Sequence, residues 1–300
     1  MTQHQPIPAS TAAPALVSPR ERHEREEAVA FARANVMLEG FTPSRRAESQ
    51  ALHYVNSEID LAGSSAWSAC LAPNDPLALA DRATLEADCA FWRLIELQVH
   101  PVVGGFDAMH LKEINRRIFQ DLPGLGFDDV TPGRYRPAVP DGKDWMKNRG
   151  LSTVEGSFFV AYSRMDAAAQ VRLDSALERA DPAKLRAMNT AEFTVCVAWI
   201  YAELDYAHPF SDGNSRTLRS FTRQLAEESG YDLDWNRFAA SRVGRDLLYI
   251  ARDRSVNALA KPLALDEQTV RKLIYTMDRV EGNRDLPDLL RDAVRPHIEA

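Results

Sequence analysis

Apolar and polar positions along most of the chain repeat with the period of an amphipathic helix. Residues 21–38 place their apolar side chains on one side until Gly40 interrupts the pattern, and residues 44–61 start a second helical segment. Strand patterns are few, so the sequence predicts an all-α fold with at most a small hairpin. The remaining helical patterns cover residues 75–100, 106–119, 163–180, 182–188, 191–206, 216–228, 235–251, 266–280 and 285–300.

The segment 191–206 differs from the others because it is apolar around most of its circumference, which is typical of a buried helix. It leads into the sequence His-Pro-Phe-Ser-Asp-Gly-Asn-Ser-Arg-Thr-Leu-Arg at residues 208–219, before the next helical pattern. A possible base, a carboxylate, a turn and two arginines therefore lie between two predicted helices. This concentration of polar chemistry marks the candidate functional site.

The turn and the arginines have the properties of a phosphate site. Gly213 and Asn214 tolerate positive φ, so successive backbone N–H groups can converge on an anion at the N-terminus of the following helix. Arg216 and Arg219 are three residues apart and share one side of the first helical turns, where both guanidinium groups can bind phosphate oxygens. The sequence therefore predicts a phosphate-binding turn.

The two remaining polar residues of this segment suggest a reaction at that phosphate. Asp212 offers a hard oxygen ligand for Mg²⁺ beside a nucleotide, although an aspartate at this position would also suit a helix cap. His208 has the side chain best suited to accept a proton from an attacking hydroxyl near neutral pH. Together they indicate attack of a hydroxyl group on a nucleotide phosphate.

The same string resembles the signature of Fic-domain proteins, His-x-Phe-x-(Asp/Glu)-Gly-Asn-Gly-Arg-x-x-Arg, and differs at a single fixed position. The resemblance implies an all-α Fic-type helical bundle that binds ATP and Mg²⁺, with His208 as catalytic base and Asp212 as metal ligand. It also implies that a phosphate cradle and two outer-phosphate ligands follow, namely Gly213, Asn214, Ser215, Arg216 and Arg219. Ser215 replaces a glycine, and a side chain there would cost about 1 kcal/mol if the backbone were left-handed.

A glycine- and proline-rich stretch precedes the helices of the site. Residues 123–150 are irregular, and so long an irregular segment in a compact domain is usually functional or mobile. In Fic proteins, a segment similar to Gly133-Arg134-Tyr135-Arg136 is followed by a β-hairpin, the flap, which holds the target's extended backbone by strand addition. We place this flap between residues 137 and 159. Four tryptophans are interpreted as packing residues: Trp92, Trp145, Trp199 and Trp235.

A second resemblance lies near the N-terminus. Residues 20–65 look like the small helical antitoxins of the VbhA type, and their inhibitory helix carries (Ser/Thr)-x-x-x-Glu-(Gly/Asn). Glu39 and Gly40 match that motif, and Asn35 occupies the Ser/Thr position. The resemblance implies an antitoxin-like segment joined to its toxin, with Glu39 pairing with Arg219. The expected organisation is a flexible tail over 1–19, inhibitory helices over 20–65 and a Fic catalytic domain over 66–300.

The function implied is an autoinhibited protein adenylyltransferase that moves AMP from ATP to a Ser, Thr or Tyr hydroxyl of a target protein. Relatives controlled by such antitoxins modify bacterial type II topoisomerases, so DNA gyrase and topoisomerase IV are the implied targets. Two alternatives stay open because of Ser215: a transferase of another phosphate-linked group, and a catalytically silent nucleotide-binding regulatory module.

Composition and residue spacing exclude several other classes of protein. A net charge of −7 disfavours direct nucleic-acid binding. The sequence contains no run of about 18 apolar residues, so it predicts no membrane-spanning helix. The histidines show no metal-ligand pair such as His-x-x-x-His. Cys70, Cys89 and Cys196 are widely spaced and match neither a disulfide framework nor a zinc pattern, so we expect buried thiols in a cytoplasmic protein.

Overall fold

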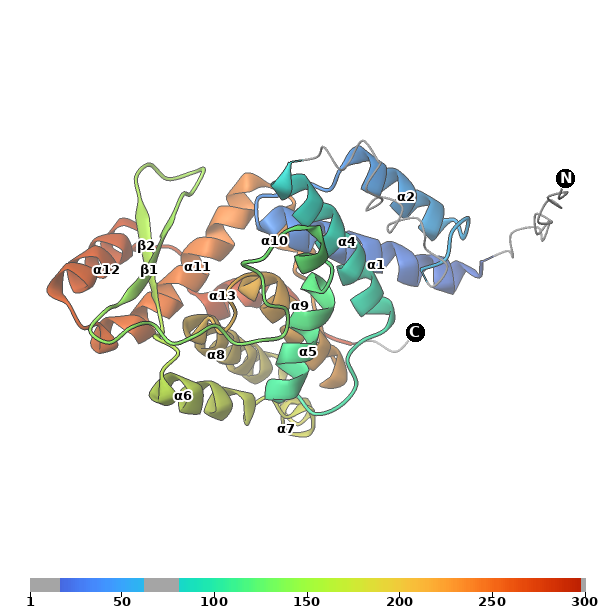
Figure 1. The fold of residues 1–300 in the computed structure, drawn as a ribbon. Helices are drawn as coiled ribbons and strands as arrows, with labels where there is room; N and C mark the ends of the chain where they lie inside the picture. Colours follow the sequence, from blue (N-terminus) through green and yellow to red (C-terminus); the bar gives the residue numbers. More distant parts are fainter. Residues whose placement is uncertain (1–16, 62–80, 298–300) are drawn as a thin grey trace, which may run out of the picture.

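The computed structural model describes residues 17–61 and 81–297, and its architecture is helical (Figure 1). Two small antiparallel sheets accompany the helices. The helices are α1 (Pro19–Leu38), α2 (Arg45–Val55), α4 (Arg82–Val99), α5 (Ala108–Phe119), α6 (Ala167–Leu177), α7 (Pro182–Arg186), α8 (Thr190–Ala207), α9 (Asn214–Glu228), α10 (Asn236–Ala239), α11 (Arg242–Ala260), α12 (Glu267–Arg279) and α13 (Leu286–Leu290). The strands are β1 (Trp145–Arg149), β2 (Phe158–Tyr162), β3 (Tyr231–Leu233) and β4 (Val294–Pro296).

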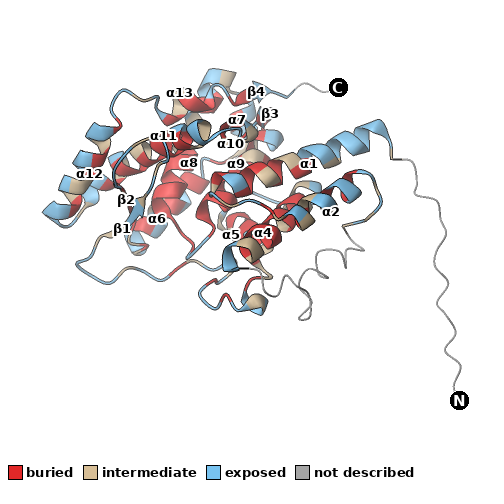
Figure 2. Ribbon diagram, turned by 90° about the horizontal axis from the view of Figure 1, so that it is seen from above, coloured by how far each residue is buried: buried red, intermediate tan, exposed pale blue. Residues whose placement is uncertain are grey.

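Helix α8 forms the centre of the domain, as its apolar circumference predicts. Asn189 caps it with a side-chain oxygen, and the Glu192 carboxylate accepts a hydrogen bond from the Asn189 backbone N–H. Figure 2 shows α8 in red along most of its length, and the neighbouring helix α9 is buried throughout residues 214–222. A capped, buried central helix provides a rigid support for whatever follows its last residue.

The N-terminal helices pack against this core on the side of α4 and α10. Ser44 caps α2 and also donates its hydroxyl to Asp88 of α4 at 2.6 Å. Arg33 of α1 forms two hydrogen bonds with Glu48 of α2, at 2.7 and 2.6 Å. The apolar side of α1, including Phe31, is buried in the same cluster as α4, α8 and α9. The end of α1 is thereby held close to α9.

Strands β1 and β2 form the hairpin expected between residues 137 and 159, although β2 continues to Tyr162. They are antiparallel, with Trp145 opposite Tyr162 and Arg149 opposite Phe158. The hairpin projects beside α11 and α12 (Figure 1), and Asn257 of α11 donates to the backbone oxygen of Phe159 at 2.8 Å. One strand of the hairpin is thus fixed to the helical core.

Several expected element boundaries are wrong. The second helix ends at Val55 rather than residue 61, and residues 163–166 are not helical because Met165 has a positive φ of 53°. The pattern over 235–251 contains two helices, since the Ser241 side chain caps a new one that runs to Ala260. The C-terminal pattern contains only the short helix α13, after which β4 pairs with β3 to form a second sheet that the sequence did not predict.

Other expectations have mixed outcomes. None of the described helices is long and apolar enough to cross a bilayer. Cys89 is buried as expected, but Cys196 is only partly buried, and Cys70 lies outside the described residues. Residues 1–16 of the expected tail and the boundary at residue 65 also lie outside them, while α1 already begins at Pro19.

Candidate functional site

His208 lies immediately after the last residue of α8. Its backbone is left-handed, with φ of 45° and ψ of 59°, a conformation that non-glycine residues seldom adopt. Two bonds hold it there: the His208 N–H donates to Leu204, and the His208 carbonyl accepts from Arg136 Nε at 2.8 Å. The reversal turns the chain sharply at the end of a rigid helix and directs the imidazole toward the hairpin.

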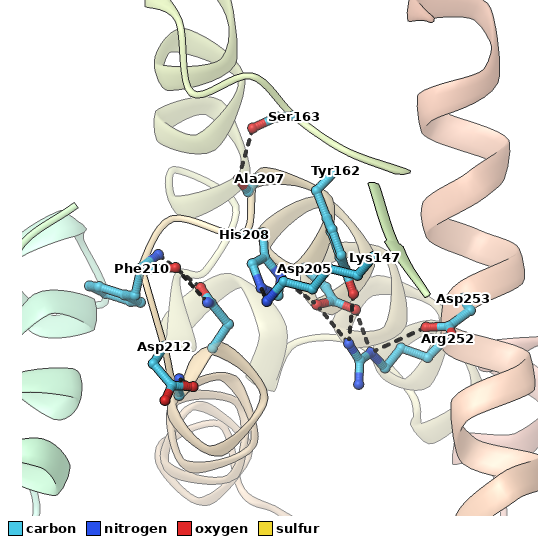
Figure 3. A network of polar contacts seen from close by, with 12 residues as sticks. Lys147, Tyr162, Ser163, Asp205, Ala207, His208, Phe210, Asp212, Arg252 and Asp253 are labelled. Atoms are coloured by element: carbon cyan, nitrogen blue, oxygen red, sulfur yellow. Dashed lines mark hydrogen bonds and ion pairs between the residues drawn. The ribbon is translucent and has the colours of Figure 1, made fainter. Parts of the chain in front are cut away.

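The imidazole is enclosed by the hairpin and by α8. Its ring centroid lies 3.9 Å from that of Tyr162 and 5.2 Å from that of Trp145. Nε2 is 3.1 Å from Lys147 Nζ, and Nδ1 is 3.7 Å from Asp205 Oδ1 (Figure 3). Burial, reinforced by the charge of Lys147, lowers the pKa of His208 to about 3 although Asp205 opposes the shift. The ring is therefore neutral at physiological pH, and one of its two nitrogens carries a lone pair.

Asp205 belongs to a buried ion pair that the sequence did not reveal. Arg252 of α11 donates from Nε and Nη2 to the two carboxylate oxygens, at 2.5 and 3.2 Å. Burial alone would raise the pKa of Asp205, but Arg252 and His208 hold it far below its usual range. The carboxylate stays charged beneath the imidazole. The signal for it was the spacing of three residues between Asp205 and His208 on one helix.

The loop after His208 is shaped by the side chain of Asn214. Its Oδ1 accepts from the Phe210 N–H at 2.9 Å, and its Nδ2 donates to the Phe210 carbonyl at 2.8 Å. Gly213 has φ of 72°, and a Cβ there would lie 2.0 Å from the ring of Phe119. Glycine is thus required at this position both by its backbone conformation and by the space available. Asn214 acts through its side chain on the loop, while its backbone begins α9.

Ser215 lies in the first turn of α9 and has no positive φ, so the strain considered for a residue replacing glycine does not arise. The residue is nearly buried at 7% exposure. A serine is compatible with the first turn of a helix because its hydroxyl can interact with nearby backbone groups. Ser215 therefore adopts an ordinary helical conformation.

Asp212 does not cap α9, because the N-cap residue is Gly213 and the cap has no side-chain hydrogen bond. The Asp212 carboxylate instead accepts from the Gly213 N–H at 2.6 Å and lies 3.8 Å from Arg216 Nη2. Its side chain is 48% exposed, and Figure 3 shows it on the opposite side of the loop from Asp205. It therefore borders the open side of the first turn of α9.

Arg216 is buried and points into the protein. Its Nη2 bonds to the Glu86 carboxylate of α4, and its guanidinium lies 4.6 Å from the ring centroid of Phe119. Its Nε and Nη1 are buried without a hydrogen-bond partner in the described part of the chain. Unpaired donors on a buried cation are costly, so this guanidinium is suited to bind an added anion.

Arg219 is fully buried and meets the end of α1, as the sequence predicted. Its Nη2 donates to Glu39 Oε1 at 2.6 Å and to the Asn35 carbonyl at 3.0 Å, and its Nε donates to Asn35 Oδ1 at 2.6 Å. Tyr249 of α11 also donates to Glu39 at 3.1 Å. Burial would raise the pKa of Glu39, but Arg219 and the neighbouring arginines lower it to about 2. Glu39 is therefore a charged ligand of Arg219.

Gly40 follows Glu39, which is the C-cap residue of α1. Its φ is 87°, a conformation suited to glycine, and Arg245 of α11 donates to the Leu38 carbonyl at 2.9 Å. Two residues of α11 thus secure the end of α1, one at the backbone of Leu38 and one at the Glu39 side chain. The predicted site residues therefore meet around the start of α9, with His208 and Asp212 on one side and the Glu39 contact on the other.

Several neighbouring residues were not identified from the sequence as parts of the site. Trp145 was interpreted as a packing residue, but it lies against His208 and beneath the Arg136 guanidinium, which is 3.7 Å from its ring centroid. Glu86 and Arg252 come from helices distant in sequence, and no local motif marks them. Lys147 could have been suspected only from its place in the expected flap.

Comparison with known proteins finds a family match over the segment that contains this site. Residues 105–226 match the Fic/DOC family. Protein adenylyltransferase VbhT of Bartonella schoenbuchensis is 31% identical over 175 residues, which cover 56% of this chain and 32% of that protein. The probable protein adenylyltransferase y4lH of Sinorhizobium fredii is 25% identical over 140 residues, 46% of this chain and 62% of that protein. The chain thus spans less than two thirds of these relatives.

Solved structures of similar proteins were also found. The N-terminal Fic domain of a putative cell filamentation protein from Bartonella quintana, with bound ADP, aligns at a TM-score of 0.39 and 20% identity, covering 71% of this chain and 84% of that one. The BepC protein of Bartonella tribocorum, with bound AMPPNP, aligns at a TM-score of 0.42 and 17% sequence identity. The alignment covers 75% of this chain and 90% of that one. The segment that holds His208, Arg216 and Arg219 lies within the match to the Fic/DOC family.

Proposed function

We propose that this protein is an autoinhibited adenylyltransferase that transfers AMP from ATP to a hydroxyl group of a target protein. His208 Nε2 accepts the proton of the target hydroxyl, whose oxygen attacks the α-phosphorus of ATP. The bond from that phosphorus to the oxygen bridging to the β-phosphate breaks, and pyrophosphate leaves. The neutral state of the buried His208 supports its assignment as the base.

The start of α9 is the proposed phosphate site. The first N–H groups of a helix lack partners within the helix and attract anions, and here they belong to Asn214, Ser215 and Arg216. The unpaired nitrogens of Arg216 and Nη1 of Arg219 supply further buried donors close by. Gly213 and Asn214 set the turn, so this site would hold the α- and β-phosphates, with Arg216 and Arg219 on the outer phosphates.

Asp212 is the proposed ligand of Mg²⁺. Nucleotide-bound Mg²⁺ commonly takes one or two protein carboxylates together with phosphate oxygens and waters, so a single half-exposed carboxylate beside the phosphate site fits the ion. The described residues contain no cluster of three or more His, Cys, Asp or Glu side chains that could hold a metal without the nucleotide. When bound, the ion would neutralise charge on the phosphates.

The observation that carries the proposal of autoinhibition is the bond between Glu39 and Arg219 at 2.6 Å. A charged carboxylate occupies the guanidinium that the outer phosphate would need, so ATP could bind only in an unproductive position. Asn35 and Gly40 support this arrangement, the first by binding Arg219 and the second by ending the helix. Residues 20–65 would then act as an intramolecular antitoxin-like segment in front of a catalytic domain at 66–300.

The target would be a protein with an accessible Ser, Thr or Tyr hydroxyl. The hairpin β1–β2 lies directly over His208, which supports a role in holding a target backbone near the base. DNA gyrase and topoisomerase IV are the candidate targets by resemblance to antitoxin-controlled relatives, and an activity on such enzymes would operate in the cytoplasm.

The test is labelling of bacterial lysate proteins with ATP radioactive at the α-phosphate. Glu39→Gly is expected to label one or a few proteins strongly, whereas the unmodified chain and Glu39→Gly/His208→Ala label none. Purified gyrase and topoisomerase IV are tested alongside. Equal labelling by the unmodified chain and Glu39→Gly would contradict autoinhibition.

Mass spectrometry of the labelled protein distinguishes the alternatives. Addition of AMP supports adenylyl transfer, and a different added mass identifies another phosphate-linked group. Binding of ATP without transfer by Glu39→Gly would indicate the silent regulatory module. The helical backbone of Ser215 speaks against that last outcome, because the turn that receives the phosphates is undistorted.

A further inference from the structure

Alternate residues of β1 face the base. Trp145 lies against the His208 ring, Lys147 reaches Nε2, and Arg149 bonds to Asp253 of α11 at 2.5 Å. Asn148, between Lys147 and Arg149, is exposed, and its side chain donates to Ser157 of the same hairpin at 3.3 Å. Because side chains alternate along a strand, one side of β1 covers the site and the other contains a natural control position.

The two neighbours of the imidazole fix its proton on Nδ1. An ammonium group has hydrogens to donate and no lone pair to accept, so Lys147 must donate to Nε2 at 3.1 Å. A carboxylate can only accept, so Asp205 favours a proton on Nδ1, although at 3.7 Å the contact is looser. The lone pair on Nε2 is therefore the basic site, and Lys147 already occupies it.

The charged groups around His208 come from every element packed against it. Lys147 lies on β1 and the neutral Tyr162 on β2, while Asp205 lies on α8 and Arg252 on α11. Arg136, in the segment before the hairpin, contacts the His208 carbonyl. Burial, Lys147 and Arg252 all disfavour the protonated ring, and Asp205 favours it. Of the two cations that lower the pKa, only Lys147 touches the ring nitrogen that would act.

We propose that Lys147 is a positioning residue that keeps Nε2 of His208 as the basic nitrogen and occupies it until the hydroxyl of a bound target takes its place. This inference rests on the proposed function. Lys147 is the residue on the flap strand that reaches the base, and the strand remains exposed to solvent at Lys147. A target aligned along β1 would therefore meet Lys147 before it meets the base. Proton transfer then begins only after docking, which limits attack by water.

The first test measures the pKa of His208 by NMR of the ¹⁵N-histidine-labelled full chain. Lys147→Met is expected to raise that pKa by about 1–3 units, because a positive charge leaves the ring nitrogen. Lys147→Arg, which keeps the charge, should restore the low value, and Asn148→Met should leave it unchanged. A pKa in Lys147→Met equal to that in Asn148→Met would overturn the proposal, whether or not the chain transfers AMP.

The second test follows hydrolysis of ATP to AMP and pyrophosphate without a target, in the Glu39→Gly chain. Adding Lys147→Met is expected to increase hydrolysis several-fold, since water no longer competes with the ammonium group, and to shift its pH dependence upward. Adding Asn148→Met should change neither. Unchanged hydrolysis and pH profile in Lys147→Met would contradict the role of Lys147.

The two tests separate failure of this inference from failure of the proposed function. If Glu39→Gly shows neither transfer nor hydrolysis but Lys147→Met still shifts the His208 pKa, the contact stands and the adenylyltransferase proposal fails. If Glu39→Gly is active and the pKa does not shift, the proposed function stands and the role of Lys147 fails.

Discussion

The end of α1 and the strand β1 approach the same site from different sides, and they hold it differently. Buried Arg219 donates three hydrogen bonds to Glu39 and Asn35. Tyr249 and Arg245 of α11 secure that end of the helix. Lys147 contacts His208 and lies 5.1 Å from the Trp145 ring centroid, on a strand that solvent still reaches. One contact is embedded in the core, and the other lies where a partner could displace it.

The difference suggests two separate restraints on one reaction. The contact from α1 occupies a phosphate ligand, so its release would require movement of a packed helix. The contact from β1 occupies the base, so binding of a target at the hairpin would suffice to remove it. In the proposed reaction Arg219 would act on the nucleotide and His208 on the hydroxyl, so the two contacts should respond to different variants.

The largest expected effect comes from Glu39→Gly. Loss of charged hydrogen bonds worth about 1.5–3 kcal/mol should raise target labelling roughly tenfold to a hundredfold. Lys147→Met in the otherwise unmodified chain should raise it little, since Glu39 still blocks the nucleotide. Rates of labelling by the four combinations of these two changes would measure this. Glu27→Gly makes the same substitution on an exposed part of α1 and should leave the protein quiet.

A smaller effect is expected from Asn35→Ala. The change leaves Arg219 Nε buried without its bond of 2.6 Å, which should lower the free energy of unfolding by about 1–3 kcal/mol. It should also activate transfer less than Glu39→Gly, because the carboxylate remains in place. Urea unfolding and labelling are measured together. Met37→Ala, at a more exposed position on the same helix, is the control, and an equal effect there would argue against a specific role for Asn35.

The sites around His208 and Glu39 should lose their contributions to stability at different acidic pH values. In the unfolded chain His208 takes up a proton below pH about 6.5, whereas in the folded chain its pKa is about 3. Between these two pH values the unfolded state binds more protons, so the stability that the neutral His208 contributes begins to fall near pH 6.5 as the pH is lowered. Glu39 has its folded pKa near 2 against an ordinary 4.5, so its contribution is intact above 4.5 and is lost toward pH 2.

The measurement is the free energy of unfolding between pH 8 and pH 3. His208→Gln should remove up to about 1.4 kcal/mol per pH unit of the decline that begins near pH 6.5, and Glu39→Gln the decline that begins near 4.5. Identical pH dependence of the free energy of unfolding in the two variants would contradict this difference between His208 and Glu39.

The smallest effect should come from Ser215→Gly, which restores the family residue at a position that belongs to neither contact. Because the backbone there is already helical, glycine gains nothing in conformation and should cost about 1 kcal/mol or less in helix stability. Thermal unfolding and labelling in the Glu39→Gly background check this. A large gain of activity would mean that the serine hydroxyl, rather than the backbone, disturbs the phosphate site.

Much of the fold could be predicted because its signals are local. The apolar circumference of residues 191–206 predicted a buried helix, and the pair Gly213-Asn214 predicted a turn before another helix. Element ends were less predictable where the cause was distant. The strand β4 forms because β3, about sixty residues earlier, offers a partner, and Ser241 begins a new helix where the apolar pattern simply continued.

By itself, the sequence determined the motif with its candidate base and arginines, since each is encoded by residue type at a fixed spacing. The expected pairing of Glu39 with Arg219 came from a resemblance to a family motif. Only the tertiary structure decided the environment of these groups. Arg252 beneath Asp205, Glu86 against Arg216 and Lys147 on His208 come from separate elements. Electrostatic interactions depend on distance in space and on burial, which a linear pattern does not contain, and for that reason the charge state of the base became apparent only in the folded chain.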